Sequence, residues 1–524
     1  MSSNRRPSPH SMLGHPLDQW AWGMGALLLA ISLLLILLGD YSTVRVQSFS
    51  WQSSTVGAEN GAFVLTFNRP MNPDSIRADT APESVCADDQ ADDNLIVTPC
   101  LPGRISWAGR RLVYTLDAPA PYGEGFTVSL TDARDRLAQP GDANFEPFIG
   151  NFASRDRAFA YIGTEAEEQG RLVLVNLSQQ GAKAILTPAN LTVLDFEPYP
   201  LGDRLLFSAT ARNQSDGILD ASLYTVATGL TPQPPEDPVL VEQALKPTTE
   251  PQGTVTEILP SGDYQTLAFD LAPNGRTLVV RPVGRTNSTD DLDIWVLTEG
   301  QDLRRLSAEQ AVGELLIAPD SKTLLLLQGQ GTTIIPLDTE TNADTVEAER
   351  LDFLPEFGRV FDLTSNGTAA AMVDFKQNNP ELRWTETLVL VNSQGDEIEL
   401  LNVDGGISDA QFDPTNQVIY ILASRLLPVD DYQEQPFLTA VNLDTQDSVE
   451  LLTLPPQTQA TMAVAPDGLA LLFTAVDLAE NNATTEPIWL LPLFTTTEDR
   501  FAATPTRNSP QPLPYQGLQP KWLP

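Results

Sequence analysis

Histidine is almost absent from this sequence, and its scarcity excludes several kinds of active site. The chain of 524 residues has only two histidines, His10 and His15, and both precede its one long apolar run. Histidine is the usual general base near neutral pH and the commonest ligand of zinc. A Ser-His-Asp triad and a histidine-ligated metal centre are therefore excluded from the main body of the chain.

Basic residues are scarce as well, with 31 Lys and Arg against 69 Asp and Glu and a formal net charge of −38. A face for nucleic acid or anionic lipid would have to form against this negative field. We expect no nucleic-acid binding, and we interpret the excess of acidic residues as an aid to solubility or an adaptation to salt.

The common short motifs of nucleotide sites and activated nucleophiles are also missing. No Gly-x-Gly-x-x-Gly, Walker loop, Gly-x-Ser-x-Gly or Cys-x-x-Cys occurs in the chain. These absences predict that the protein is not an enzyme and has no catalytic, cofactor-binding or metal-binding residues.

Cysteine is limited to Cys86 and Cys100. Because they are the only pair and lie in one predicted domain, we predict a disulfide between them, with two buried free thiols as the alternative. Four aspartates between them could ligate calcium, although a hydrated acidic loop is the commoner outcome. These aspartates are Asp88, Asp89, Asp92 and Asp93.

One long apolar run is present, since the 19 residues from Trp20 to Leu38 carry no charge. At about 1.5 Å per residue, a helix of this length just spans a hydrocarbon core of about 30 Å. Arg5 and Arg6 precede the run, which places the N-terminus in the cytoplasm by the positive-inside rule. We predict a cytoplasmic tail over 1–18 and a transmembrane helix over 19–40. The chain would be a single-pass protein of a bacterial cytoplasmic membrane, with its bulk outside the cytoplasm.

Two alternatives for this run are disfavoured. A cleaved signal peptide would need a small-x-small pattern, which is missing after Leu38. A buried core helix does not fit the polar flank before the run or the strand-like sequence after it.

Short alternating segments follow over 44–152. Apolar residues two apart share one face of a strand, and Pro and Gly separate the segments, which predicts a small antiparallel β-sandwich. The segments lie at 63–67, 105–107, 112–116 and 126–130. The strand that ends in Phe67, Asn68, Arg69, Pro70 and Met71 resembles the bacterial Ig-like domain of S-layer and other surface proteins. This resemblance implies a spacer or adhesion module without chemistry of its own.

A repeat fills the chain over 153–524. An apolar strand, a turn and a second apolar strand recur, as around Pro273, Asn274 and Gly275. The turn positions lie 46 to 52 residues apart, close to the period of a four-stranded propeller blade. They are 273, 319, 365, 414 and 466. A third strand follows in seven units, at 172–176, 223–226, 294–297, 333–337, 388–392, 438–442 and 488–493.

The first unit lacks a leading segment before its strand at 159–162. The missing innermost strand is predicted at the other end of the chain, where 519–524 includes Trp522 and Pro524. We predict an all-β fold after the N-terminal helix, with seven blades closed by this C-terminal strand and six blades as the alternative.

The repeats resemble the blades of TolB-like and WD-like β-propellers. Asp293, Ile294 and Trp295 carry the match, together with the turns at 319–320 and 466–468. The resemblance implies a propeller fold but little about function, because receptors, scaffolds and the non-catalytic domains of peptidases share this repeat. Two proline-rich stretches, 228–256 and 495–516, break the period and predict loops that project from the ring.

These features together predict a membrane-anchored binding or assembly protein whose propeller contacts a protein partner or ligand in the cell envelope. Its oligomeric state is not predicted. Two alternatives stay open: a carboxylate-based hydrolase of cell-envelope glycans and a ligand-sensing receptor subunit, which would need another protein for signalling. The hydrolase would use acidic residues near the first strands of their units. The candidates are Asp195, Glu197, Asp270, Asp362 and Asp413.

Overall fold

The computed structural model is almost entirely β-structure. It describes residues 16–38, 43–77, 94–136, 145–212, 220–235, 245–262, 264–284, 294–306, 313–328, 331–337, 359–376, 379, 385–428, 432–477, 486–494 and 505–524. The described helices are α1 (Pro16–Leu38) and the short 3-10 turns η1 (Pro73–Ser75), η2 (Ala166–Glu168) and η3 (Leu177–Gln179). All other regular elements in these ranges are strands, so the prediction of an all-β fold after an N-terminal helix is confirmed at this level.

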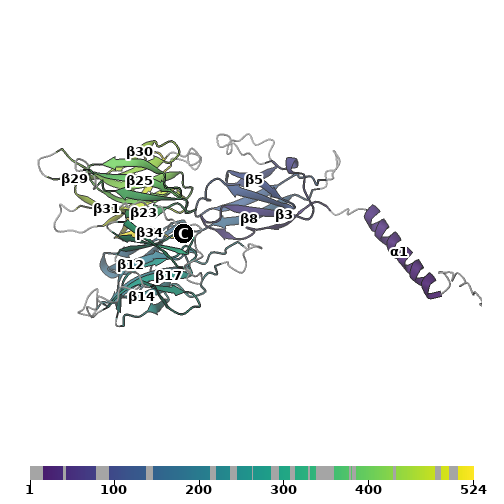
Figure 1. Cartoon of the computed structure of the whole chain (residues 1–524), viewed down its shortest axis with the longest axis horizontal. Helices are drawn as coiled ribbons and strands as arrows, with labels where there is room; N and C mark the ends of the chain where they lie inside the picture. The colour runs from purple at the N-terminus through teal and green to yellow at the C-terminus, as the bar shows by residue number, and fades with distance from the viewer. Residues whose placement is uncertain are drawn as a thin grey trace, which may run out of the picture.

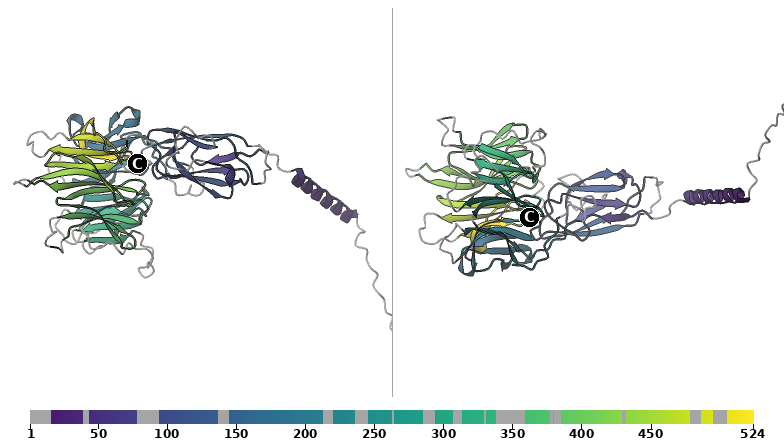
Figure 2. Two further views of the ribbon diagram at one scale, coloured as in Figure 1. Left: turned by 90° about the horizontal axis from the view of Figure 1, so that it is seen from above. Right: turned by 60° about the horizontal axis from the view of Figure 1, so that its bottom comes forward.

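The N-terminal helix α1 stands apart from the sheets in every view (Figures 1 and 2). A transmembrane helix needs about 20 predominantly apolar residues. Within the part of the chain that the structure describes, no helix is both long and apolar enough to cross a bilayer. This finding contradicts the single-pass anchor predicted between Trp20 and Leu38, and with it the predicted localisation in a bacterial cytoplasmic membrane. We correct both predictions.

Two four-stranded sheets form the body that lies next to α1 (Figure 1). One has the order β1-β3-β6-β5 and the other β2-β8-β7-β4. Phe63, Leu65 and Phe67 alternate along β3 and are fully buried, in one core with Phe126 and Phe152 of the other sheet. The two sheets therefore face each other across a shared apolar layer, as alternation predicted. Their strands are β1 (Val46–Phe49), β2 (Thr55–Val56), β3 (Ala62–Phe67), β4 (Leu95–Thr98), β5 (Gly103–Ala108), β6 (Arg111–Leu116), β7 (Gly125–Leu130) and β8 (Phe148–Ser154).

Five separate antiparallel sheets follow, each made of strands that are consecutive in the sequence. The repeat predicts their positions because each apolar strand ends at a turn residue. The first two sheets are β12 (Leu191–Pro198), β13 (Arg204–Ala211), β14 (Ser222–Ala227), β15 (Val255–Leu259), and β16 (Tyr264–Leu271), β17 (Thr277–Gly284), β18 (Ile294–Thr298), β19 (Arg304–Leu306). The third has β20 (Glu314–Ile317), β21 (Thr323–Gln328) and β22 (Gly331–Pro336). The last two are β23 (Arg359–Leu363), β24 (Ala369–Asp374), β25 (Glu386–Asn392), β26 (Glu397–Val403), and β27 (Ile407–Phe412), β28 (Val418–Leu426), β29 (Glu434–Asn442), β30 (Ser448–Thr453).

A seven-stranded sheet joins the two ends of this region, in the order β11-β10-β9-β34-β33-β32-β31. Its central strand β34 (Gln511–Trp522) pairs with β33 through Pro512 and with β9 through Trp522, which lies opposite Phe159. The strand β34 thus forms hydrogen-bonded pairs with both the last and the first strands of the region. The other members are β9 (Ala158–Gly163), β10 (Leu172–Asn176), β11 (Ala182–Ile185), β31 (Thr458–Val464), β32 (Ala470–Asp477) and β33 (Pro487–Pro492).

The proline-rich stretches differ from their prediction where the structure describes them. Residues 511–516 belong to β34 although Pro512 and Pro514 lie within them. In the other stretch, the Thr248 N–H donates to the buried Asp203 carboxylate (2.6 Å), and the carbonyl of Gln233 accepts from Thr55 N–H (2.5 Å). These described parts pack against the sheets rather than project from them.

Candidate functional site: a central acidic cavity

A cavity with a volume of about 710 Å³ lies among the first strands of the sheets. Its walls come from β12, β16, β20, β27 and β31 and from the end of β34. The ionisable lining residues are five carboxyl groups and one ammonium group. They are Asp195, Glu197, Asp270, Glu314, Asp409 and Lys521. Phe269 and Trp522 also line the cavity, although both side chains are largely buried in the neighbouring apolar cores.

Three of the five predicted acidic residues meet in this cavity, namely Asp195, Glu197 and Asp270. The other two have structural contacts instead. Asp362 accepts from the backbone N–H groups of Leu363 (2.8 Å) and Phe412 (2.9 Å), and burial raises its pKa to about 6. Asp413 lies in the turn after β27, where it accepts from Gln417 and Val418 N–H, both at 2.7 Å.

Asp270 lies near the end of β16, where it is opposite Val279 of β17. Its carboxyl oxygens accept from Leu271 N–H (2.9 Å) and from Ile317 N–H in β20 (2.5 Å). Burial raises the pKa of Asp270 to about 7 and the charge of Glu197 adds to this rise, whereas the two N–H donors and the Lys521 ammonium lower it. Near neutral pH this carboxyl group is therefore present in both protonation states.

Lys521 is the only basic residue in the described lining of the cavity, and sequence analysis did not select it. Its Nζ donates to the carbonyl oxygen of Phe196 (2.7 Å), forms an ion pair with Glu197 and lies 3.7 Å from Asp195 Oδ1. Burial lowers the pKa of Lys521, but Glu197 and Asp195 outweigh that effect and raise it overall. The position of Lys521 beside Trp522 in the predicted closing strand was the one available signal.

A second polar group lies on the side of β20 and β27. Gln411 Nε2 donates to Asp409 Oδ2 (2.8 Å), and Glu314 pairs with Arg359 of β23 (3.3 Å). Burial raises the pKa of Asp409 to about 6, and the charge of Glu314 adds to this rise. Among the described residues, no group of three or more His, Cys, Asp or Glu is placed to hold a metal ion.

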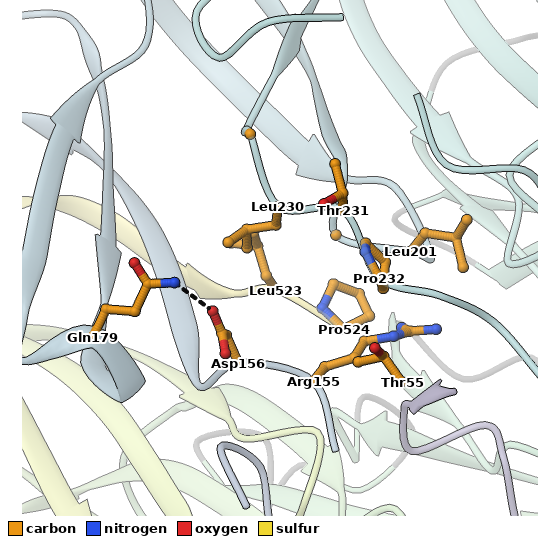
Figure 3. Close-up of a pocket in the computed structure, with 12 residues that line it drawn as sticks. Thr55, Arg155, Asp156, Gln179, Leu201, Leu230, Thr231, Pro232, Leu523 and Pro524 are labelled. Carbon is orange, nitrogen blue, oxygen red and sulfur yellow. Dashed lines mark hydrogen bonds between the residues drawn. The ribbon is translucent and has the colours of Figure 1, made fainter. Parts of the chain in front are cut away.

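A smaller cavity of about 230 Å³ lies where the first two sheets meet the later ones (Figure 3). Thr55 lines it from β2, Arg155 and Asp156 from the connection to β9, and Pro524 from the residues after β34. Arg155 is 4% exposed, donates to the carbonyl of Pro200 (2.7 Å) and pairs with Glu59. The residues of this junction thus serve mainly to hold the two bodies together.

Several predicted features stay predictions. Cys86 lies outside the described residues, so its disulfide with Cys100 is not settled here. The same holds for calcium at Asp88, Asp89, Asp92 and Asp93, which also lie outside them. A protein partner in the cell envelope also remains a prediction.

Comparisons with known proteins reveal distant structural likenesses only. No family model and no curated protein matches the chain. An oligogalacturonate lyase from Vibrio parahaemolyticus aligns with a TM-score of 0.40 and 11% identity over 69% of this chain and 85% of that one. Prolyl oligopeptidase B from Galerina marginata aligns with a TM-score of 0.44 and 10% identity over 70% of this chain and 52% of that one. A puromycin hydrolase aligns with a TM-score of 0.36 and 15% identity over 77% of this chain and 61% of that one.

The proteins named in these comparisons are all enzymes. We correct the prediction that the chain is not an enzyme, because it rested on missing residues and motifs, and such an absence excludes only the chemistry that needs them. The missing histidines exclude only histidine-dependent chemistry, whereas the cavity contains carboxyl groups that can exchange protons without histidine. The likenesses assign no substrate or reaction to this chain.

Proposed function

We propose that residues 153–524 form a seven-bladed β-propeller closed by β34, and that 44–152 form an Ig-like sandwich docked on it. Three side chains support the ring by tying the first strand of one sheet to the first strand of the next. Asp270 accepts from Ile317 N–H, Asp362 from Phe412 N–H, and Gln411 from Val464 N–H (3.0 Å). β34 completes the circle by contacting β9, β12 and β31.

The proposed function is that of a carboxylate-based hydrolase that cleaves glycosidic bonds in the central cavity. The observation that carries it is the contrast between two neighbouring carboxyl groups. Burial and the charge of Glu197 keep Asp270 partly protonated near neutral pH, whereas Glu197 is ion-paired with the Lys521 ammonium. Glycosidases need such a pair, with one carboxyl group as proton donor and one carboxylate as base or nucleophile.

The shape and lining of the cavity favour a sugar over a smaller or more apolar ligand. Its volume of about 710 Å³ lies within the range of small-molecule sites, about 300 to 1,000 Å³. The carboxyl groups and Gln411 offer partners for hydroxyl groups. The negative lining disfavours acidic sugars, so the proposed substrate is a neutral or amino-substituted glycan.

The test is reducing-sugar release from a panel of neutral and amino-sugar oligosaccharides and aryl glycosides, measured across pH. Loss of general acid–base catalysis typically lowers kcat by about 100-fold to 10,000-fold. We expect losses in this range for D270N and E197Q on any cleaved substrate. The matched control is E397Q, because Glu397 is an exposed carboxylate on β26 outside the cavity. No turnover across the panel, or turnover that D270N and E197Q retain, would overturn the proposal.

A further inference from the structure

Lys521 links two features of the molecule that are otherwise separate, the closing strand and the acidic cavity. Its backbone lies in β34 opposite Ala160 of β9, and its side chain crosses to β12. There it contacts the Phe196 carbonyl, pairs with Glu197 and lies 5.4 Å from the centre of the Phe196 ring. No other basic side chain appears in the described cavity lining.

Removal of this ammonium group would leave carboxylates facing one another. Asp195 and Glu197 on β12 and Asp270 on β16 all act on the charge of Lys521. Glu314 on β20 and Asp409 on β27 complete the ionisable lining, and Arg359 on β23 pairs with Glu314. Like charges disfavour each other's ionisation, so a cation here favours the ionised form of the carboxyl groups that face it.

We propose that Lys521 is a positioning residue that ties Glu197 and Asp195 to the strand that closes the ring, so that the acid–base pair is complete only when β34 is docked. This inference rests on the hydrolase function proposed above and concerns the regulation of the same site. The pairing of β34 with β9 and the charge balance of the cavity are then coupled, because the strand that pairs with β9 also supplies the ammonium group of the cavity.

The experiment measures the pKa of Asp270 in the full chain by carboxyl carbon-13 NMR, with the resonance assigned by its loss in D270N. Lys521 lowers this pKa, so K521M should raise it above about 7. The expected rise is about 0.5, below the change of roughly 1 to 3 that an opposite charge in direct contact with a carboxyl group causes, because Lys521 is the weakest of the causes that act on Asp270. K521R keeps the charge and should restore the pKa to near its original value.

The matched control is K376M, which removes the same charge from a lysine paired with Asp374 and Glu399 on other strands. An unchanged Asp270 pKa in K521M, or an equal rise in K376M, would overturn the inference. If K521M does not fold, E197Q serves instead, because Glu197 raises the Asp270 pKa and its removal should lower it. An unchanged pKa in E197Q would overturn the inference in that case.

Kinetics separate this inference from the proposed function. In an active enzyme, K521M should move the alkaline limb of the pH profile upward together with the Asp270 pKa, and K521R should restore it. If no substrate is cleaved but the NMR shift occurs, the hydrolase proposal fails while the positioning role of Lys521 stands. If turnover occurs and neither the limb nor the Asp270 pKa moves in K521M, the positioning role fails alone.

Discussion

Acidic side chains in the first strands either hydrogen-bond one sheet to the next or line the cavity, and one of them does both. Asp270 and Asp362 each accept one N–H from the following residue and one from the first strand of the next sheet. These contacts are structural, and Asp362 is absent from the described cavity lining. Asp270 makes the same contacts and also faces the cavity, so a structural tie and a candidate proton donor coincide in one residue.

The raised pKa values predict how stability depends on pH. Asp270 at about 7 and Asp362 at about 6 titrate above the value of about 3.9 for an unfolded aspartate. The folded chain therefore binds more protons than the unfolded chain between about pH 4 and 7, so its stability falls as pH rises through this window. We expect D270N to reduce this loss by about 1 to 3 kcal/mol, measured as the change in thermal stability between about pH 5 and 8.

This prediction concerns the slope with pH and not the absolute stability of the variant. An asparagine retains only one oxygen for the two N–H groups that Asp270 accepts, so D270N should be less stable at every pH. E397Q removes one exposed carboxylate and should leave the slope unchanged. A D270N slope equal to that of the unaltered chain would show that Asp270 titrates normally.

Among the elements, β34 is predicted in part by the sequence pattern, which gives its pairing with β9 but not its first residues. The period of the repeat predicts a strand at 519–524 that pairs with 159–162, and β34 pairs with β9 through Leu518, Lys521 and Trp522. The pattern did not predict that the same strand begins at Gln511, because Pro512 and Pro514 argue against a ladder strand. In the structure Pro512 lies opposite Trp489 of β33, and Pro514 falls where the pairing with β33 is irregular, between Pro512 and Gln516.

Trp522 allows the contribution of this strand to be measured. It is 6% exposed, its Nε1 donates to the Ala463 carbonyl (3.0 Å), and its ring meets that of Phe159 edge to face. Truncation of a buried aromatic residue typically costs about 3 to 5 kcal/mol. We expect W522A to lower the melting temperature accordingly, because it weakens the contacts of β34 with both β9 and β31.

The control on the same strand is L518A, since Leu518 is 41% exposed and should contribute less than about 0.5 kcal/mol. Both melting temperatures can be followed by tryptophan fluorescence and circular dichroism. Equal melting temperatures for W522A and the unaltered chain would mean that the end of β34 is not needed to hold the seven-stranded sheet together.

On the scale of the whole molecule, the sequence predicts the sheets but not how they meet. Asp320 and Asp467 occupy equivalent turn positions in the repeat. Asp320 is exposed and accepts from Lys322 and Thr323 within its own turn. Asp467 is 1% exposed, because the sandwich covers it. Periodicity gives the position of a residue in its unit and not the partner packed on it, which also explains why Lys521 and Asp409 were missed.

Asp467 is one of the residues that connect the two bodies. Its Oδ2 accepts from Tyr122 N–H of the sandwich body (3.0 Å) and pairs with Arg157, while its Oδ1 accepts from Leu469 N–H (3.1 Å). Loss of the charge weakens the contacts of Asp467 with Tyr122 N–H and Arg157, and a hydrogen bond to a charged group typically contributes about 1.5 to 3 kcal/mol. D467N should therefore loosen the docking of the sandwich without unfolding either body.

Trypsin offers a direct measure, because Arg155 and Arg157 lie in the connection between the two bodies and Arg155 is only 4% exposed in the docked form. We expect D467N to be cleaved at these arginines at least about 10-fold faster, because an opening free energy reduced by about 1.4 kcal/mol already increases the open population tenfold. D320N alters the equivalent aspartate away from the junction and should leave the cleavage rate unchanged. Equal rates for D467N and D320N would show that the sandwich is held by other contacts, with the Arg155 ion pair to Glu59 and its bond to the Pro200 carbonyl as the next to remove.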